Sequence, residues 1–272
     1  MALTYVVPVS GGKDSQVVMD LAIGWHGKAQ LRFVHQNTGY DHPDTYKHLR
    51  WMARHYGVRI EHTHSAKYAD IFDFIEKAGY FPGQVARGCT SRLKQEPFAA
   101  WLRTEFDLTK PDQVHIYMGM RCDESTKRGV KYAGLETDTQ LTLGQIASEY
   151  SSIDFRHVTV SLPIVEWSTE DVFEHLAQRR LHINPLYKRG HHRVGCYPCL
   201  LARNAEWEAA STDPVGRAHM ERLVQIEDKF AAEKNPRKLI KIHPTRDVRA
   251  LLAKGAETMK PTDDDACGWC SI

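Results

Sequence analysis

Ser10-Gly11-Gly12-Lys13-Asp14-Ser15 is the stretch that decides the fold of this chain of 272 residues. An apolar, β-branched run at residues 5–9 leads into it, and apolar side chains then recur at helical spacing through Val17, Leu21 and Trp25. This pattern predicts a strand, a glycine turn and a helix. Such a junction points backbone N–H groups and the positive end of a helix dipole at one place, and glycines let a phosphate approach the main chain. We therefore expect a phosphate-binding loop here.

The spacing of the glycines excludes a Walker P-loop, because nothing before Lys13 supplies the second glycine that this motif needs. The alternative is a glycine turn that caps an ordinary helix. We set it aside because the strand before the turn and the helix after it are both those of a phosphate-binding loop. The hexapeptide instead resembles the pyrophosphate loop (PP-loop) of the ATP pyrophosphatases. The resemblance implies cleavage of ATP between the α and β phosphates, with adenylation of a substrate.

Composition limits the class of protein. A net charge of +2 gives no global basic field, so any contact with nucleic acid should be local, although the 15 histidines could add charge in mild acid. No apolar stretch approaches the roughly 20 residues of a membrane span, and we see no secretory leader. We expect a cytoplasmic protein with no membrane contact. Six cysteines in that compartment favour metal ligands or redox thiols over disulfides.

Strand and helix patterns alternate along the first 165 residues and predict an α/β fold with a mostly parallel sheet. Expected strands are 5–9, 30–34, 58–62, 114–118 and 158–163, and expected helices include 43–56, 68–80 and a capped helix that begins at Ser168. Polar turns follow two strands, at Asn37-Thr38-Gly39 and at residues 119–125, where open α/β sheets bind ligands. Residues 127–150 lack a clear pattern, and we expect a mobile loop over the site.

Cysteines recur in three segments of the chain. Cys89 opens a helix rich in cations, Cys196 and Cys199 form a C-x-x-C after a basic, aromatic turn, and Cys267 and Cys270 form another in an acidic tail. We expect three parts: a nucleotide-binding domain at 1–165, a helical, cysteine-bearing subdomain at 166–254, and a flexible tail at 255–272.

Four motifs in order resemble the phosphoadenosine-phosphosulfate reductase branch of the PP-loop superfamily. They are the loop at 10–15, the helix start at 89–94, the segment 119–125, and the block from Pro185-Leu186-Tyr187 to Cys199. This branch includes sulfonucleotide reductases, ATP sulfurylase small subunits and DNA-phosphorothioation proteins. The resemblance implies an adenine-nucleotide α-hydrolase-like fold, a Rossmann-like sheet flanked by helices.

Two features favour an adenylating, sulfur-transferring member of the branch. Lys13 gives the loop the form found in enzymes that cleave ATP, whereas reductases bind a finished nucleotide and usually carry an altered loop. Gly88 stands where cluster-containing reductases have a further cysteine, so three thiols would hold a 4Fe-4S cluster with one iron open. This resembles cluster-dependent tRNA thiolation enzymes and phosphorothioation proteins.

Other readings of the cysteines remain open. Cys89, Cys196 and Cys199 could hold Zn²⁺ together with His191 or His192, or they could be free thiols. We expect both histidines at the rim of the site and Cys122 in strand-end packing. The cations beside the motifs favour phosphate or sulfate binding over a solvated rim.

The proposed roles follow the motifs. The loop, Ser10 to Ser15, would hold ATP and its Mg²⁺, with Lys13 and Asp14 also catalytic; Asp14 or Asp123 would help to hold the ion. Asn37, Thr38 and Gly39 would line the nucleotide, and Arg121, Asp123 and Arg193 would position the group being activated. Cys89, Cys196 and Cys199 would hold the metal centre. Expected partners are a nucleotide, a sulfur donor or thiol-redox protein, a local nucleic-acid contact and a second copy of the chain.

The tail carries a further catalytic expectation. Cys267 and Cys270 have the spacing of a redox pair in which one thiol attacks and the other resolves the mixed disulfide. A thiol near the C-terminus also fits the alternative function, an adenylyl-sulfate or phosphoadenylyl-sulfate reductase that produces sulfite. Two more readings are a tail with incidental thiols and a nucleotide-sensing subunit of a modification complex.

Overall fold

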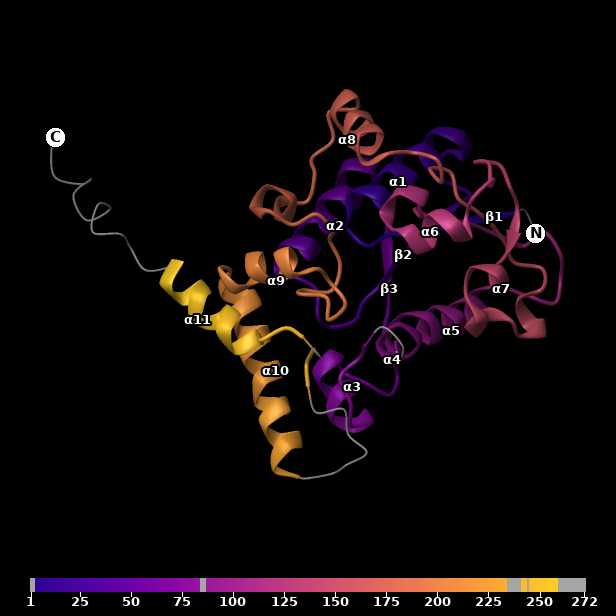
Figure 1. Ribbon diagram of the computed structural model, residues 1–272. Coiled ribbons are helices and arrows are strands. Elements are labelled where there is room, and N and C mark those ends of the chain that lie inside the picture. Colours follow the sequence, from indigo (N-terminus) through magenta and orange to yellow (C-terminus); the bar gives the residue numbers. More distant parts are fainter. Residues whose placement is uncertain (1–2, 84–86, 234–240, 244, 259–272) are drawn as a thin grey trace, which may run out of the picture.

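A six-stranded sheet forms the centre of the computed structural model, which describes residues 3–83, 87–233, 241–243 and 245–258 (Figure 1). The strands run in the order β3-β2-β1-β4-β6-β5, and every neighbouring pair is parallel except β5 and β6. Their bounds are β1 Thr4–Pro8, β2 Leu31–Gln36, β3 Ile60–Thr63, β4 Val114–Tyr117, β5 Leu141–Thr142 and β6 Thr159–Ser161. The predicted α/β fold with a mostly parallel sheet is therefore confirmed.

Alternation along β1 separates the two faces of this sheet, because successive side chains of a strand point to opposite sides. Val7 packs on one face under helices α1 (Lys13–His26), α2 (Pro43–Tyr56) and α8 (Thr169–Gln178). Val6 packs on the other face under α5 (Glu96–Glu105) and α7 (Leu143–Ile146). Both faces are covered, as parallel sheets require.

A third core joins the C-terminal helices to a helix from the first half of the chain. Trp207 of α9 (Asn204–Ser211) and Phe230 of α10 (Pro214–Ala232) share this core with Phe74 of α3 (Ile71–Ala78). Figure 1 shows α9, α10 and α11 (Val248–Thr258) grouped together, with α3 beside α10. Helix α11 runs four residues into the segment expected as tail, so residues 255–258 are helical.

Local signals set the helix ends. Ser168 and Asp171 form the capping box predicted for α8, and Gly57 ends α2 in the left-handed conformation. Helix α4 (Gly88–Thr90) continues through a π-helical turn, η1 (Ser91–Gln95), into α5, so Cys89 lies at the start of a long helical segment. Short 3₁₀ turns complete the described chain: η2 Cys122–Glu124, η3 Ser148–Tyr150, η4 Ile153–Phe155 and η5 Pro185–Arg189.

The expectation of a mobile loop at 127–150 is wrong. This segment contains α6 (Thr126–Lys131), the edge strand β5 and α7, and it buries Tyr132, Leu143 and Ile146 in the core under α5. Each element is too short to show a period in the sequence, so only the packing reveals it. In the described ranges we find no helix long and apolar enough to cross a membrane.

Candidate functional site

The loop between β1 and α1 is closed by its two serines. The Ser10 amide donates to the Ser15 Oγ at 3.0 Å, and that hydroxyl donates to the Gly12 carbonyl at 3.0 Å. Gly11 has φ of +74°, a conformation that other residues rarely adopt. The loop thus presents the N-terminus of a 14-residue helix, which attracts anions.

Lys13 is held at this helix start with only 5% of its surface exposed. Its Nζ donates to Asp14 Oδ2 at 3.0 Å and lies 5.9 Å and 5.8 Å from the ring centroids of Phe173 and Tyr187. Two aromatic rings and a carboxylate therefore fix the ammonium group beside the loop.

Arg121 is almost fully buried and ties the end of β4 to the phosphate loop. Its Nε donates to Asp14 Oδ1 at 2.6 Å, and its remaining N–H groups reach Asp123, the Trp167 carbonyl and Thr169. Gly119, just before it, lies so close to the loop that a Cβ would stand 2.9 Å from the Asp14 carbonyl carbon. Arg121 thus holds Asp14, and its contact with a substrate stays a prediction.

The carboxylates of Asp14 and Asp123 differ in whether an oxygen is left to bind a cation. Asp14 uses both oxygens, one for Lys13 and one for Arg121. Asp123 is half exposed, and its described bonds, from Arg121 and Thr169, all go to Oδ2. The Thr169 hydrogen bonds, followed by Arg121, lower the pKa of Asp123 and keep it ionised. Asp123 is therefore the better placed of the two to meet a cation.

A buried asparagine that the sequence reading missed clamps the loop from the other side. Asn184 donates from Nδ2 to the Gly11 carbonyl at 3.1 Å and to Thr45 Oγ1 at 3.2 Å, and it accepts from the Leu186 amide. The Asn-Pro pair at 184–185 is a turn signal that could have indicated it. The Pro185–Cys199 block thus begins at the phosphate loop.

Two arginines stand at the outer rim. Arg193 is 67% exposed, with its guanidinium 3.8 Å from Glu124, and Arg128 pairs with the same carboxylate. Burial and then the Arg193 charge lower the pKa of Arg128. The sequence reading missed Arg128 because it lies in the segment that carried no pattern.

The turn at 37–39 lies against the cysteine segment. Asn37 Oδ1 accepts from the Gly39 amide and from the Tyr46 hydroxyl, at 2.9 and 2.7 Å. The Thr38 hydroxyl lies 3.4 Å from the Cys196 sulfur, and the Tyr197 amide donates to the Tyr40 carbonyl at 2.8 Å. The end of β2 and the C-x-x-C segment are therefore bonded together, and the contact of residues 37–39 with a nucleotide stays a prediction.

The three thiols share the half-buried Lys94 as a charged neighbour. Thiolate charge, first that of Cys196, raises the pKa of Lys94, with Cys199 and Cys89 adding to it. Burial raises the pKa of Cys89, and burial raises that of Cys196 to about 11. The donors suit iron or zinc by chemistry, because cysteine sulfur is a soft ligand that binds either metal once it has released its proton. Across the described residues, however, no three His, Cys, Asp or Glu side chains are arranged to hold a metal ion.

The two histidines of the Pro185–Cys199 block differ in burial. His191 is buried, against our expectation of a rim position, because its ring lies 2.9 Å from Glu206 and 3.2 Å from the Tyr197 hydroxyl. His192 is exposed, as expected. Cys122 packs against the core beside β4, also as expected. Cys267 and Cys270 lie outside the described residues.

Gly88 faces a space that is already filled. A Cβ at this position would collide with the Tyr80 hydroxyl and lie 2.9 Å from Phe74 Cζ. A fourth cysteine, which the reductase pattern places here, therefore has no room beside Cys89 while Tyr80 keeps its position.

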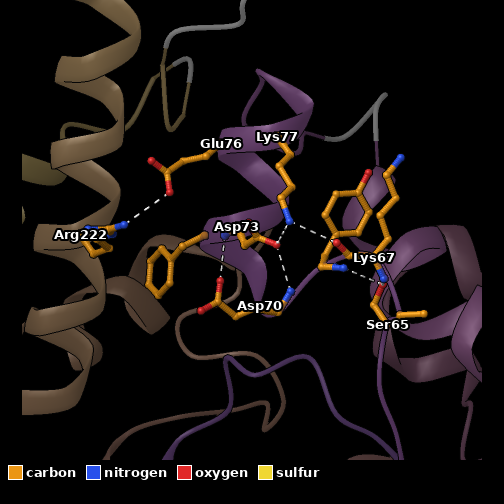
Figure 2. Close-up of a pocket in the computed structure, with 11 residues that line it drawn as sticks. Ser65, Lys67, Asp70, Asp73, Glu76, Lys77 and Arg222 are labelled. Carbon is orange, nitrogen blue, oxygen red and sulfur yellow. Dashed lines mark hydrogen bonds and ion pairs between the residues drawn. The ribbon is translucent and has the colours of Figure 1, made fainter.

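Of two cavities, one has the phosphate loop on its wall and the other has none of the site residues described above. A small one of about 70 Å³ has Ser10 of the loop on its wall together with His35, Asp41, Lys94 and Gly195, so it connects the loop to the surroundings of the thiols. A larger one of about 840 Å³ is lined by residues 65–70 and by α3, with Arg222 of α10 at its side. Figure 2 shows the bonds among its lining charges, with Asp73 to Lys77 and Glu76 to Arg222.

Comparison with known proteins identifies the class. A model of the phosphoadenosine phosphosulfate reductase domain matches residues 4–202, so the chain belongs to that family. An uncharacterised protein of Methanocaldococcus jannaschii is 27% identical over 194 residues, which are 71% of this chain but only 35% of that protein. The chain therefore spans about a third of that relative.

Two more relatives are longer than the shared region. An uncharacterised protein of Escherichia phage 186 is 27% identical over 74% of this chain and 68% of its own length. The adenosine 5′-phosphosulfate reductase of Allochromatium vinosum is 25% identical over 63% of this chain and 59% of its own. The phosphoadenylyl-sulfate reductase of Candida auris, solved with phosphate, shares the fold: its TM-score is 0.51 at 14% identity, over 72% of this chain and 82% of that one.

Proposed function

We propose that this protein is an ATP pyrophosphatase that adenylates an acceptor and couples this activation to sulfur transfer. The observation that carries the proposal is Lys13, a buried ammonium group fixed at the mouth of the phosphate loop. An acceptor oxygen would attack the α phosphorus of ATP, and the bond between that phosphorus and the oxygen that bridges it to the β phosphorus would break. The products are an adenylated acceptor and pyrophosphate.

The residues around the loop have separate tasks in this reaction. Loop amides and the α1 dipole bind the phosphates, and Lys13 stabilises the charge that develops on the leaving pyrophosphate. Arg121 keeps Asp14 beside Lys13 through the hydrogen bond of 2.6 Å from Arg121 Nε to Asp14 Oδ1. Asp123 is the candidate ligand for Mg²⁺, which neutralises phosphate charge when it is bound. Arg128 and Arg193 add positive potential at the rim.

The link to sulfur rests on how close the cysteine segment lies to the loop. The cavity that has Ser10 on its wall also has Lys94, the cation that the three thiols share. Cys89, Cys196 and Cys199 are the residues that would hold a 4Fe-4S cluster, which supplies sulfur or electron chemistry when bound. The acceptor that we favour is a nucleic acid, met by exposed cations such as Arg193 and Lys188.

A sulfonucleotide reductase is the second candidate, because a curated relative carries that name and the tail ends in a dithiol. Lys13 in the loop speaks against it, and Tyr80, in the space that a cysteine at position 88 would need, speaks against the cluster-containing kind of reductase.

Pyrophosphate release from ATP and Mg²⁺ tests the proposal. We expect release by the wild-type protein and none by Lys13→Ala, with Lys47→Ala as a control because Lys47 is 68% exposed on α2. Equal thermal unfolding midpoints would show that the variants keep the fold. Tight binding of an adenylyl sulfate without ATP turnover would favour the reductase, and ATP binding without turnover would favour a sensing subunit. Iron and zinc analysis of anaerobic protein tests the metal centre separately.

A further inference from the structure

Tyr187 brings a hydroxyl group into the phosphate loop from 174 residues away. Its oxygen accepts a hydrogen bond from the Lys13 amide at 2.8 Å. A Cβ on Gly12 would stand 3.3 Å from the same oxygen, so the hydroxyl lies directly over the Gly12–Lys13 backbone. This is the part of the loop at which a helix N-terminus meets an anion.

The position of this hydroxyl is fixed by its neighbours. The Tyr187 ring packs edge-on against Phe173, with centroids 5.6 Å apart and planes at 88°. The Tyr187 amide donates to the carbonyl of Asn184, whose side chain is itself bonded to Gly11 and Thr45. Moving Tyr187 away from the loop would therefore disturb a buried clamp, and we infer that it stays when a phosphate binds.

The hydroxyl still has a proton to donate. A phenol offers one O–H donor besides its acceptor positions, and no residue in the described part of the chain accepts this proton from Tyr187. Burial raises the pKa of Tyr187, so the group remains a protonated donor at neutral pH. A donor of this kind beside an anion-binding loop forms a charge-assisted hydrogen bond with a phosphate oxygen.

We propose that Tyr187 is a phosphate ligand, whose hydroxyl donates to an oxygen of the polyphosphate while its own oxygen keeps the Lys13 amide in place. This deepens the proposed function and rests on it, because it names the group by which the Pro185–Cys199 block contacts the nucleotide. The ligand class is a di- or triphosphate anion with Mg²⁺.

Calorimetric titration with magnesium pyrophosphate tests this assignment on the full chain. Tyr187→Phe keeps the ring and removes only the hydroxyl, and we expect its affinity to fall by about tenfold or more, the loss typical of a hydrogen bond to a charged group. Tyr56→Phe is the matched control, because it removes another buried hydroxyl, bonded to Asp20 and not to the loop. Its affinity should equal that of the wild type.

The possible results distinguish a failure of the Tyr187 assignment from a failure of the proposed function. If the wild-type protein binds no pyrophosphate, both the Tyr187 assignment and the proposed function are refuted. Binding that Tyr187→Phe leaves unchanged would remove only the role of Tyr187, and tighter binding would show that the hydroxyl competes with phosphate for the Lys13 amide. A fluorine label at Tyr187, as 3-fluorotyrosine, keeps the hydroxyl and makes the test independent of the folding of the variant. Its resonance should shift with pyrophosphate while a label at Tyr56 does not, and an unmoved resonance overturns the proposal.

Discussion

Arg121 and Asp14 are joined by a hydrogen bond of 2.6 Å between Nε and Oδ1, across 107 residues of sequence. Arg121 is 1% exposed and Asp14 17%, so the pair is largely shielded from water. It joins the polar cluster after β4 to the phosphate loop after β1, the two neighbouring strands at the centre of the sheet. These two motifs therefore act as one unit, and the carboxylate that steadies Lys13 is itself held by Arg121.

Arg121→Gln should separate these motifs. Removing one partner of a buried ion pair typically costs about 3–5 kcal/mol, and here the loss should lie near the lower end of that range because Asp14 keeps its bond to Lys13. We expect a drop in unfolding free energy of that order and loss of pyrophosphate release. Chemical denaturation gives the first quantity. Lys47→Gln, which removes an exposed charge, should change stability by less than about 1 kcal/mol; an equally small effect of Arg121→Gln would contradict the buried role.

Asn184→Ala should loosen the loop without touching its sequence. The change removes the donors to the Gly11 carbonyl and to Thr45 and leaves a buried carbonyl without its partner, at a cost of about 1–3 kcal/mol. Magnesium pyrophosphate should also bind more weakly, which calorimetry measures. Asn204→Ala, on the exposed start of α9, serves as the control for binding. Unchanged pyrophosphate affinity in Asn184→Ala would mean that the clamp is not needed for the loop geometry.

The sequence predicted the sheet and the loop because both depend on local patterns. The apolar run before Ser10 and the glycines after it specify strand, turn and helix, and the capping box at Ser168 specifies the start of α8. The elements between 126 and 150 escaped prediction because β5 has two residues and α7 four, too few for a period. Their positions depend on pairing with β6 and on the core under α5.

The site was predictable by motif but not by role. The motifs indicated Lys13, Asp14 and Arg121. Only the fold reveals that the N–H groups of Arg121 donate to other protein groups. Asn184 and Arg128 were missed because a single asparagine or arginine carries no pattern until the chain brings it to the loop. His191 was placed wrongly for the same reason, since its partner Glu206 lies on α9, outside the segment that carries His191.

Acid should weaken the fold through His48. Burial lowers the pKa of His48 to about 4 from the usual 6.5, and its Nε2 lies 3.0 Å from Gln16 Oε1. Because the folded pKa is the lower one, protonation favours unfolding: the stability contribution is complete above pH 6.5 and is lost as pH falls toward 4. Between pH 7 and pH 4 this amounts to on the order of 3 kcal/mol.

His48→Gln should therefore flatten the pH dependence of the unfolding free energy in this window. His64→Gln, which changes an exposed histidine, should leave the slope as in the wild type. Equal slopes for the wild type and His48→Gln would show that His48 does not contribute to acid lability.

The tail dithiol makes a prediction from sequence alone. Truncation after Lys260 should leave ATP cleavage intact and abolish multiple turnover in sulfur transfer, if Cys267 and Cys270 relay sulfur or electrons. The double substitution of both cysteines by serine is the matched control, because it keeps the length of the tail. Unchanged turnover in both variants would mean that these thiols are incidental.

Tyr80 and Gly88 allow a direct test of the missing fourth ligand. A side chain at position 88 would meet the Tyr80 hydroxyl and Phe74, so Gly88→Ala should lower stability by about 1–3 kcal/mol through overpacking. Gly24→Ala is the opposite control: this exposed glycine in α1 has nothing near its Cβ position, and alanine should stabilise the helix by about 0.5–1 kcal/mol.

Adding Tyr80→Ala to Gly88→Ala should recover part of the loss, because it opens the space that the new methyl group needs. The coupling energy from this double-mutant cycle measures the clash. Gly88→Cys with Tyr80→Ala then provides room for a fourth thiol, and anaerobic iron analysis checks whether the variant holds more iron than the wild type. Gly88→Cys alone should hold no more iron than the wild type. If Gly88→Cys alone is stable and gains iron, Tyr80 does not exclude the fourth ligand, and the argument against a reductase loses its structural support.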